Sequence, residues 1–158
     1  MTGLCGWIGE SGVAAADGIL QRMGSALCRF DHSRLSTNVG PLAALAVAGD
    51  ERTATLFADG STQLALSGHP RWEHGDSHLT DIHAICPAFL DAYRSEGPEV
   101  LKALKGDFAF ALFDSERHEA LLAIDRIGIR NLVYQETRGG LIFGSTADAL
   151  AAHPDVRR

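Results

Sequence analysis

Hydrophobic residues follow helix-like spacing in some segments and continuous, strand-like runs in others. Apolar intervals of three and four predict a helix over 13–28, with Asp17 as its N-cap, and another over 82–95, with Pro87 in its first turn. The unbroken apolar run at 42–48 is typical of a buried strand. Further strands are predicted at 4–9, 53–57, 62–66, 108–114, 120–124, 132–134 and 141–143, short helices at 98–104 and 148–152, and loops at 33–41 and 67–81.

The order of these segments indicates the fold class. Strands come first, two helices follow, and more strands and a short helix end the chain, which favours α+β over strict β-α alternation. Asp59-Gly60 between two β-rich runs signals an antiparallel hairpin. The run at 108–113 is apolar at every position and needs cover on both faces, which two sheets stacked between helical layers would supply.

Composition narrows the class of protein. The 158 residues, 46% of them hydrophobic, suffice for one core, so residues 1–158 are expected to form a single domain. The net charge of -6, without a Lys/Arg cluster, argues against nucleic acid and anionic membranes as partners. No apolar run approaches the roughly 20 residues of a bilayer span, and the N-terminus lacks signal-peptide features. Three cysteines without a CxxC pair fit a reducing cytoplasm.

Two features that could suggest other chemistry have simpler interpretations. Four histidines between residues 69 and 83 show no ligand spacing on a shared element, which favours a solvated polar loop over a metal site. Gly139-Gly140 is interpreted as a turn, because no Gly-Lys-Ser/Thr follows to make a phosphate-binding loop. We therefore predict no metal and no cofactor in this chain.

Three stretches near the C-terminus resemble the second half of the glutaminase domain of asparagine synthetase B. Residues 105–114 read KGDFAFALFD, beside a family pattern of roughly L-x-G-x-F-A-F-A-x-x-D. Residues 121–134 read LLAIDRIGIRNLVY, beside A-R-D-x-x-G-x-x-P-L-Y-Y, and residues 140–150 read GLIFGSTADAL, beside x-F-A-S-E-x-K-A-L. Asn131 stands where the family usually has Pro, and Ile124 where it usually has Arg.

This resemblance implies a class II, N-terminal-nucleophile (Ntn) glutamine amidotransferase domain. Such domains open asparagine synthetase B and the related lasso-peptide cyclases and β-lactam synthetases. The implied fold is a four-layer α-β-β-α sandwich of two mainly antiparallel sheets. Glutamine is the implied substrate, hydrolysed to release ammonia.

The opening of the chain places a cysteine in a family-like context. Residues 4–9 read LCGWIG and are similar to the family's opening M-C-G-I-x-G, which makes Cys5 the candidate nucleophile. The mechanism needs a free α-amine on that residue as the local base, so residues 1–4 would have to be removed. The alternative is that Cys5 is a small apolar residue of a buried strand, a common place for free cysteine.

The other site residues follow the family's pattern only in part. Gly68 is aligned with the backbone donor of the oxyanion hole, and Ser67 stands where the family has a longer Asn. Arg52 is the nearest candidate for the arginine that clamps the glutamine carboxylate. Ile85 aligns with the family's Asp for the glutamine α-amine, and Asp81 lies one helical turn earlier. These departures predict weak or undetectable glutamine hydrolysis.

Two functions remain open at this stage. One is a glutaminase that supplies ammonia to an ATP-dependent amide-forming synthetase domain or subunit. The other is a non-catalytic scaffold of the same fold, as in enzymes that make lasso peptides or β-lactams. No Ser-Gly-Gly-x-Asp loop is present in the sequence, so ATP and Mg are expected only in a partner. The apolar segment 148–154 is a candidate contact surface, unless it only caps the domain's own core.

Overall fold

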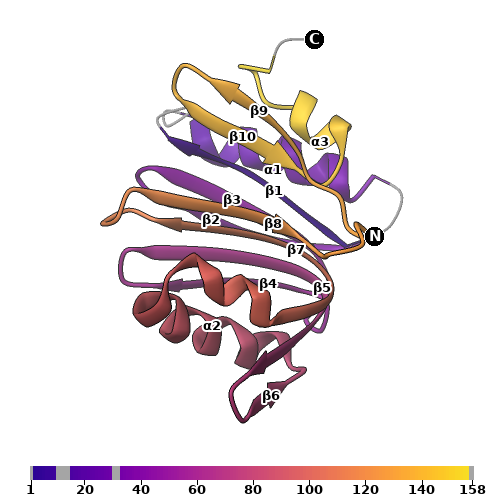
Figure 1. The fold of residues 1–158 in the computed structure, drawn as a ribbon. Helices are drawn as coiled ribbons and strands as arrows, with labels where there is room; N and C mark the ends of the chain where they lie inside the picture. The colour runs from indigo at the N-terminus through magenta and orange to yellow at the C-terminus, as the bar shows by residue number, and fades with distance from the viewer. Residues whose placement is uncertain (1, 10–14, 30–32, 157–158) are drawn as a thin grey trace.

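Two antiparallel sheets stack face to face between helices in the computed structural model, which describes residues 2–9, 15–29 and 33–156 (Figure 1). In the described residues, the strand order of one sheet is β2-β3-β1-β10-β9, and that of the other is β4-β5-β7-β8, with β6 added beside β5. The strands are β1 (Gly3–Gly9), β2 (Arg34–Val39), β3 (Ala43–Gly49), β4 (Ala54–Asp59), β5 (Thr62–His74), β6 (Ser77–Leu79), β7 (Leu104–Asp114), β8 (Glu119–Ile124), β9 (Val133–Thr137) and β10 (Gly140–Gly144). The helices are α1 (Ala16–Leu27), α2 (Ile82–Glu96), the 3-10 helix Pro98–Ala103 and α3 (Ala147–Ala151).

Helices α1 and α3 cover the outer face of the first sheet (Figure 1). The predicted spacing is confirmed, because the apolar stripe of α1 is buried against β1 and β3. The predicted cap is wrong: Ala15 is the N-cap residue and makes no side-chain bond, while Asp17 lies inside the first turn. An acidic group there still interacts favourably with the helix dipole.

Helix α2 covers the outer face of the second sheet and begins where it was predicted. Asp81 is its N-cap, and its carboxylate accepts a hydrogen bond from the His83 backbone N–H at 3.0 Å. Pro87 lies within the helix, beyond the first turn in which it was predicted. The helix tolerates the missing N–H because Ile85, Phe89 and their neighbours are buried against the sheet.

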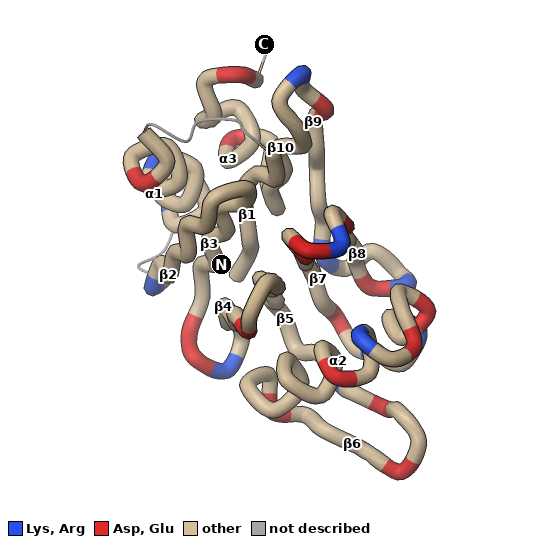
Figure 2. The backbone as a smooth tube through the Cα atoms, turned by 90° about the vertical axis from the view of Figure 1, so that its left-hand side faces the viewer, with Lys and Arg blue, Asp and Glu red and all other residues tan. Residues whose placement is uncertain are grey.

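The layer between the sheets is built largely from small and aliphatic side chains. Leu4 and Ile8 of β1 meet Ala65 of β5 and Ala109 and Ala111 of β7 in this layer. Figure 2 shows charged residues at turns, at strand ends and on helices α1 and α2, while β1 and β3 carry none. The fold is therefore the predicted α+β, four-layer α-β-β-α sandwich of two mainly antiparallel sheets.

Two predicted loops are strands. The segment at 33–41 holds the edge strand β2. Its polar residues predicted a loop, but its backbone pairs with β3. The segment at 67–81 continues β5 to His74 and then forms β6. Pro70 is tolerated in β5 because β4 no longer pairs with the strand beyond Ser67, so one of its edges is open there.

The C-terminal segment that was predicted as a contact surface packs on its own domain through two of its residues. Ala149 and His153 are buried, and the His153 ring lies edge-on to Trp7 with ring centroids 5.1 Å apart. Asp148 forms an exposed ion pair of 3.0 Å with Arg29. Ala149 and His153 therefore complete the helical layer over the first sheet, as the alternative for residues 148–154 expects, while the exposed positions of the segment stay a predicted contact surface.

The described helices also bear on the membrane question. None of them is long and apolar enough to cross a bilayer.

Substitution of Phe89 tests the packing of α2 on the second sheet. Phe89 is buried between Trp72 and Phe110, with ring centroids 5.7 and 4.8 Å away. We expect Phe89→Ala to lower the free energy of unfolding by about 3–5 kcal/mol, measured by denaturant titration. Val39→Ala, at a more exposed position on β2, is the control and should change it by about 0.5 kcal/mol or less. Equal effects of the two substitutions would contradict this packing.

The burial of His153 predicts a dependence of stability on pH. Burial lowers the pKa of His153 below its usual value of 6.5, so the unfolded chain binds a proton at a pH where the folded chain does not. Stability from this group is therefore complete above about pH 6.5 and decreases as the pH falls below it. We expect His153→Phe to flatten the change in unfolding free energy between about pH 7 and about pH 5. The exposed His78→Ala should leave that slope unchanged, and equal slopes in wild type and His153→Phe would show the prediction wrong.

Candidate active site

Cys5, the predicted nucleophile, lies in the middle of sheet pairing and faces the helical layer. It pairs with Ala46 of β3 and Gly144 of β10, and its fully buried side chain belongs to the apolar cluster under α1 and α3. Desolvation, with a smaller contribution from Cys28, raises the pKa of the Cys5 thiol far above its ordinary value. The thiol is therefore protonated and shielded from the layer between the sheets.

Ser67 and Gly68, the predicted oxyanion residues, lie on β5 where it faces the other sheet. Ser67 shares the inward face of β5 with Ala65 and is fully buried, and its Oγ has no hydrogen-bond partner among the described residues. Gly68 has a positive φ of 113°, and a Cβ there would lie 2.3 Å from the Asp107 carbonyl oxygen. The Gly68 N–H donates to the Thr53 carbonyl at 2.8 Å, so it points to the β3–β4 turn.

Arg52 lies in that same β3–β4 turn. The Asp50 carboxylate accepts hydrogen bonds from the Arg52 N–H and the Thr53 hydroxyl, each at 2.9 Å, and these bonds lower the pKa of Asp50. The exposed Arg52 borders a depression of about 740 Å³ that His69 and Asp107 also line. Ser67, Gly68 and Arg52 thus come together at one end of the sandwich, which Cys5 does not reach.

Asp81 uses its carboxylate to cap α2. Its neighbour Thr80 lines the same depression as Arg52, so Asp81 lies beside this end of the molecule. Ile85, at the position aligned with the family's Asp, is fully buried in the core under α2. No carboxylate therefore takes the place of that Asp from position 85.

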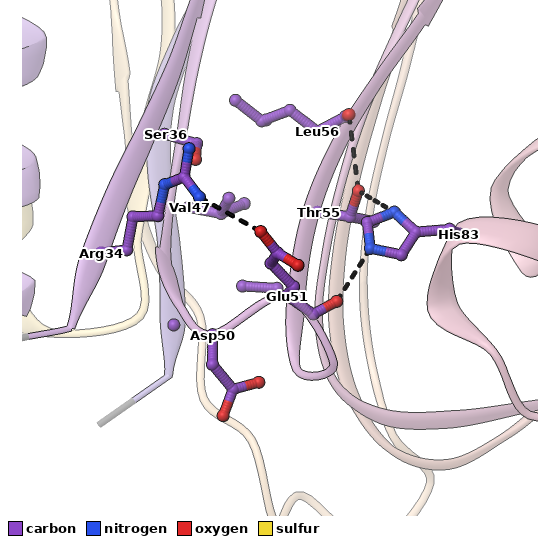
Figure 3. Close-up of a pocket in the computed structure, with 10 residues that line it drawn as sticks. Arg34, Ser36, Val47, Asp50, Glu51, Thr55, Leu56 and His83 are labelled. Carbon is purple, nitrogen blue, oxygen red and sulfur yellow. Dashed lines mark hydrogen bonds and ion pairs between the residues drawn. The ribbon is translucent and has the colours of Figure 1, made fainter.

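A second cavity, of about 310 Å³, opens between β2, β3 and β4 (Figure 3). Arg34 pairs with the Glu51 carboxylate at 3.2 Å, and His83 binds the Glu51 carbonyl at 2.8 Å and the Thr55 hydroxyl at 3.3 Å. The side chains of Arg34, Thr55 and His83 in this cavity are thus already engaged. Within the part of the chain that the structure describes, no three His, Cys, Asp or Glu side chains form a metal-binding group.

A polar network at the start of β1 escaped the sequence prediction. Arg130 donates to the Thr2 hydroxyl at 2.5 Å and pairs with the Asp107 carboxylate at 2.7 Å, which His69 also contacts at 3.3 Å. Desolvation alone would raise the pKa of Asp107, but hydrogen bonds from Arg130 and His69 hold it below the usual value. The Asp125 carboxylate accepts the Arg130 backbone N–H at 2.8 Å and so fixes the loop that carries this arginine.

A cavity of about 210 Å³ opens beside this network. Thr2, Arg130, Asn131, Ser145 and Thr146 are among its lining residues. Residues with hydroxyl, guanidinium and amide side chains thus border the same small space.

The spacing of the first glycines allows two alignments with the family's opening, and one of them points to Thr2. The spacing Gly-x-x-Gly of the family's opening occurs twice, from Gly3 to Gly6 and from Gly6 to Gly9. The second register places Cys5 before the first glycine, and the first register places Thr2 there. Because the registers differ by three residues, they assign opposite faces of β1 to the nucleophile position.

Comparison with known proteins adds sequence similarity to this geometry. Residues 80–158 match the family model described as the glutamine amidotransferase domain. Asparagine synthetase B [glutamine-hydrolyzing] of Escherichia coli is 35% identical over 100 residues, which are 62% of this chain and 17% of that protein. Asparagine synthetase [glutamine-hydrolyzing] 3 of Bacillus subtilis is 34% identical over 68 residues, or 43% of this chain and 11% of that protein. The chain thus spans less than a fifth of the length of these relatives.

A solved structure supports the same assignment at the level of the fold. Glutamine phosphoribosylpyrophosphate (PRPP) amidotransferase from B. subtilis superposes with a TM-score of 0.63 at 13% identity, covering 96% of this chain and 43% of that one. The sandwich agrees with this structure in fold, and because half of the chain is matched by the family model, the chain belongs to the glutamine amidotransferase domain family.

Proposed function

We propose that residues 1–158 form one asparagine-synthetase-like amidotransferase domain that works with an ATP-dependent amide-forming synthetase and hydrolyses glutamine weakly. The observation that carries the proposal is the Gly68 N–H, which lies at the aligned oxyanion position but donates to Thr53 at 2.8 Å. The fold of an amidotransferase is kept, while its key donor is used inside the domain.

Weak hydrolysis follows from what an oxyanion hole requires. Its donors must point to the atom on which negative charge develops, and the loss of one such donor costs about 10²–10³ in kcat. Gly68 must first break its bond to Thr53 before it can act in this way. Ser67 has a shorter side chain than Asn, and the Asp81 carboxylate already caps a helix. Glutamine would therefore meet a site in which several recognition groups are short or engaged.

An exposed apolar surface supports association with a synthetase. Ile127, Ile129 and Tyr134 are 78%, 59% and 64% exposed, and they lie on and just after the β8–β9 connection. Ile127 and Ile129 also border the depression lined by Arg52. The relatives bear the name asparagine synthetase and extend far beyond the matched domain. We assign this surface to a synthetase domain, either a separate subunit or a further part of the same protein.

ATP and Mg would be bound by that synthetase, with glutamine the only small molecule that this domain takes. The free thiols of Cys5 and Cys86 fit a reducing cytoplasm as the place where the domain works. Neither nucleic acid nor a membrane is a proposed partner.

A non-catalytic scaffold, as in lasso-peptide cyclases and β-lactam synthetases, is the second candidate function. The burial of Cys5 under α1 and α3 favours it, because the thiol has no path to a substrate between the sheets. In that case the domain serves its synthetase partner through packing alone.

The activity prediction concerns ammonia release by the purified chain. We expect release from glutamine far below about 1 per second, the lower end of common enzyme turnover. A coupled ammonia assay with and without enzyme measures it. Release at about 1 per second or faster, abolished by Cys5→Ala, would contradict both the predicted weakness and the buried position of Cys5.

The partner prediction concerns the exposed isoleucines. We expect the full-length protein, tagged in its native host, to co-purify with a synthetase or to contain one. In a two-subunit system, Ile127→Asp with Ile129→Asp should raise the Kd for that synthetase at least about tenfold, because each buried isoleucine contributes about 1.5–3 kcal/mol. Val39→Asp, on the edge strand β2, is the control and should leave the Kd unchanged. A protein that runs as a monomer and carries no synthetase would count against the proposal.

A further inference from the structure

The start of β1 places a hydroxyl group where the buried cysteine cannot reach. Leu4 and Ile8 point into the layer between the sheets, and Thr2 lies on the same side of the strand's alternation. Thr2 is only partly buried, at the end of β1 past which the β8–β9 connection runs (Figure 1). The side chains of Cys5 and Trp7 point the opposite way, into the helical layer.

We propose that Thr2, and not Cys5, is the nucleophile of this domain, acting as an N-terminal threonine on the side-chain carboxamide of glutamine. The assignment rests on the proposed amidotransferase function and names the residue that performs it. It requires a free α-amine on Thr2, so the mature chain is expected to begin at Thr2. An N-terminal threonine whose own amine serves as base is an established chemical solution for amide hydrolysis.

The chemistry balances within this residue and its substrate. The Thr2 Oγ1 attacks the carboxamide carbon while the α-amine accepts the hydroxyl proton. The C–N bond breaks, the ammonium form of the amine returns the proton to the leaving nitrogen, and ammonia leaves a glutamyl ester on Oγ1. Water then attacks the ester with the amine again as base, which releases glutamate and restores the hydroxyl.

Arg130 positions the hydroxyl for this reaction. Its guanidinium donates to Oγ1 at 2.5 Å, which leaves the hydroxyl proton directed elsewhere and places positive charge where an alkoxide forms. Asp107 binds the same guanidinium through two nitrogens, at 2.9 and 2.7 Å, and Asp125 holds the Arg130 backbone. The arginine is thus fixed by both carboxylates before substrate arrives.

A cavity large enough for a carboxamide lies beside Thr2, and the unpaired Ser67 hydroxyl belongs to the same region. Asn131 and Leu27 of α1 line the 210 Å³ cavity together with Thr2. On the other side, a Cβ on Gly49 would lie 2.9 Å from Thr2 Cγ2 and 2.7 Å from the Ala54 Cβ, so these residues form one wall. Ala54 pairs with Ser67, whose buried Oγ has no partner among the described residues and faces the same layer.

A threonine nucleophile also agrees with the weak glutamine hydrolysis proposed above. A hydroxyl is a poorer nucleophile than a thiol, of which a few per cent is ionised near neutral pH. Cysteine at position 2 would therefore react faster in the same geometry. This gives the assignment a gain-of-function test.

Intact mass of the full-length purified protein is the first measurement, and the expected result is a chain that begins at Thr2. Ammonia release and glutamyl-enzyme formation from glutamine are then compared, the latter by mass analysis of the N-terminal peptide. Thr2→Val keeps the branched shape and should lose both signals, whereas Thr2→Cys should raise ammonia release at least about tenfold. Cys86→Ala, in the core under α2, is the matched control and should keep wild-type behaviour.

Three results would overturn the assignment. One is a mature chain that retains Met1 or begins at Cys5. Another is glutamyl transfer that survives Thr2→Val and disappears in Cys5→Ala. The third is the absence of ammonia release and glutamyl transfer from every variant, Thr2→Cys included, in protein whose mass shows a free residue 2. None of these three results depends on binding to the synthetase. A failure of the broader proposed function is therefore recognised separately, by the co-purification experiment.

Discussion

Strand β1 is buried on both faces, and this constraint decides what each of its residues can do. Every residue from Gly3 to Ile8 is buried, with β3 on one side of the strand and β10 on the other. Because successive side chains point to opposite faces, each residue belongs either to the helical layer or to the layer between the sheets. A shift of one residue would exchange the two sets and expose neither. A residue of this strand can therefore reach a substrate only at the end near Thr2, where the side that faces the other sheet meets solvent.

At that end, charge-assisted hydrogen bonds join the two sheets where apolar packing stops. Asp107 belongs to β7 of one sheet and Thr2 precedes β1 of the other, and Arg130 bonds to both. The carboxylate of Asp125, just after β8, accepts hydrogen bonds from the backbone N–H groups of Ile129 and Arg130 and so holds the loop that carries the arginine. Hydrogen bonds to ionised groups are among the stronger ones in proteins, so this network fixes the separation of the strand ends. The same residues thus close the core and shape the candidate site.

The sequence was most informative where burial gives a clear period. The spacing that predicts α1 and α2, and the apolar runs that predict β3 and β7, arise because these elements are covered by others. Edge strand β2 and the outer part of β5 carry polar residues because one of their edges or faces is open, so composition alone indicated loops. The sequence could not decide the role of Cys5 for another reason: the repeated glycine spacing fits two registers, and only the packing of β1 shows which face each register selects.

The state of the oxyanion position depends on one turn. Within the β3–β4 turn, Asp50 binds the Arg52 N–H and the Thr53 hydroxyl, while the Ala54 N–H bonds to the Asp50 carbonyl at 3.0 Å. These bonds hold the Thr53 carbonyl against the Gly68 N–H and keep Arg52 at the border of the outer depression. Gly68 is present, and its N–H is engaged because the local hydrogen bonds of the turn place the Thr53 carbonyl beside it. A rearrangement confined to residues 50–53 would free the Gly68 N–H at the end of the β4–β5 pairing, so the weak hydrolysis proposed for this domain is compatible with an intact fold.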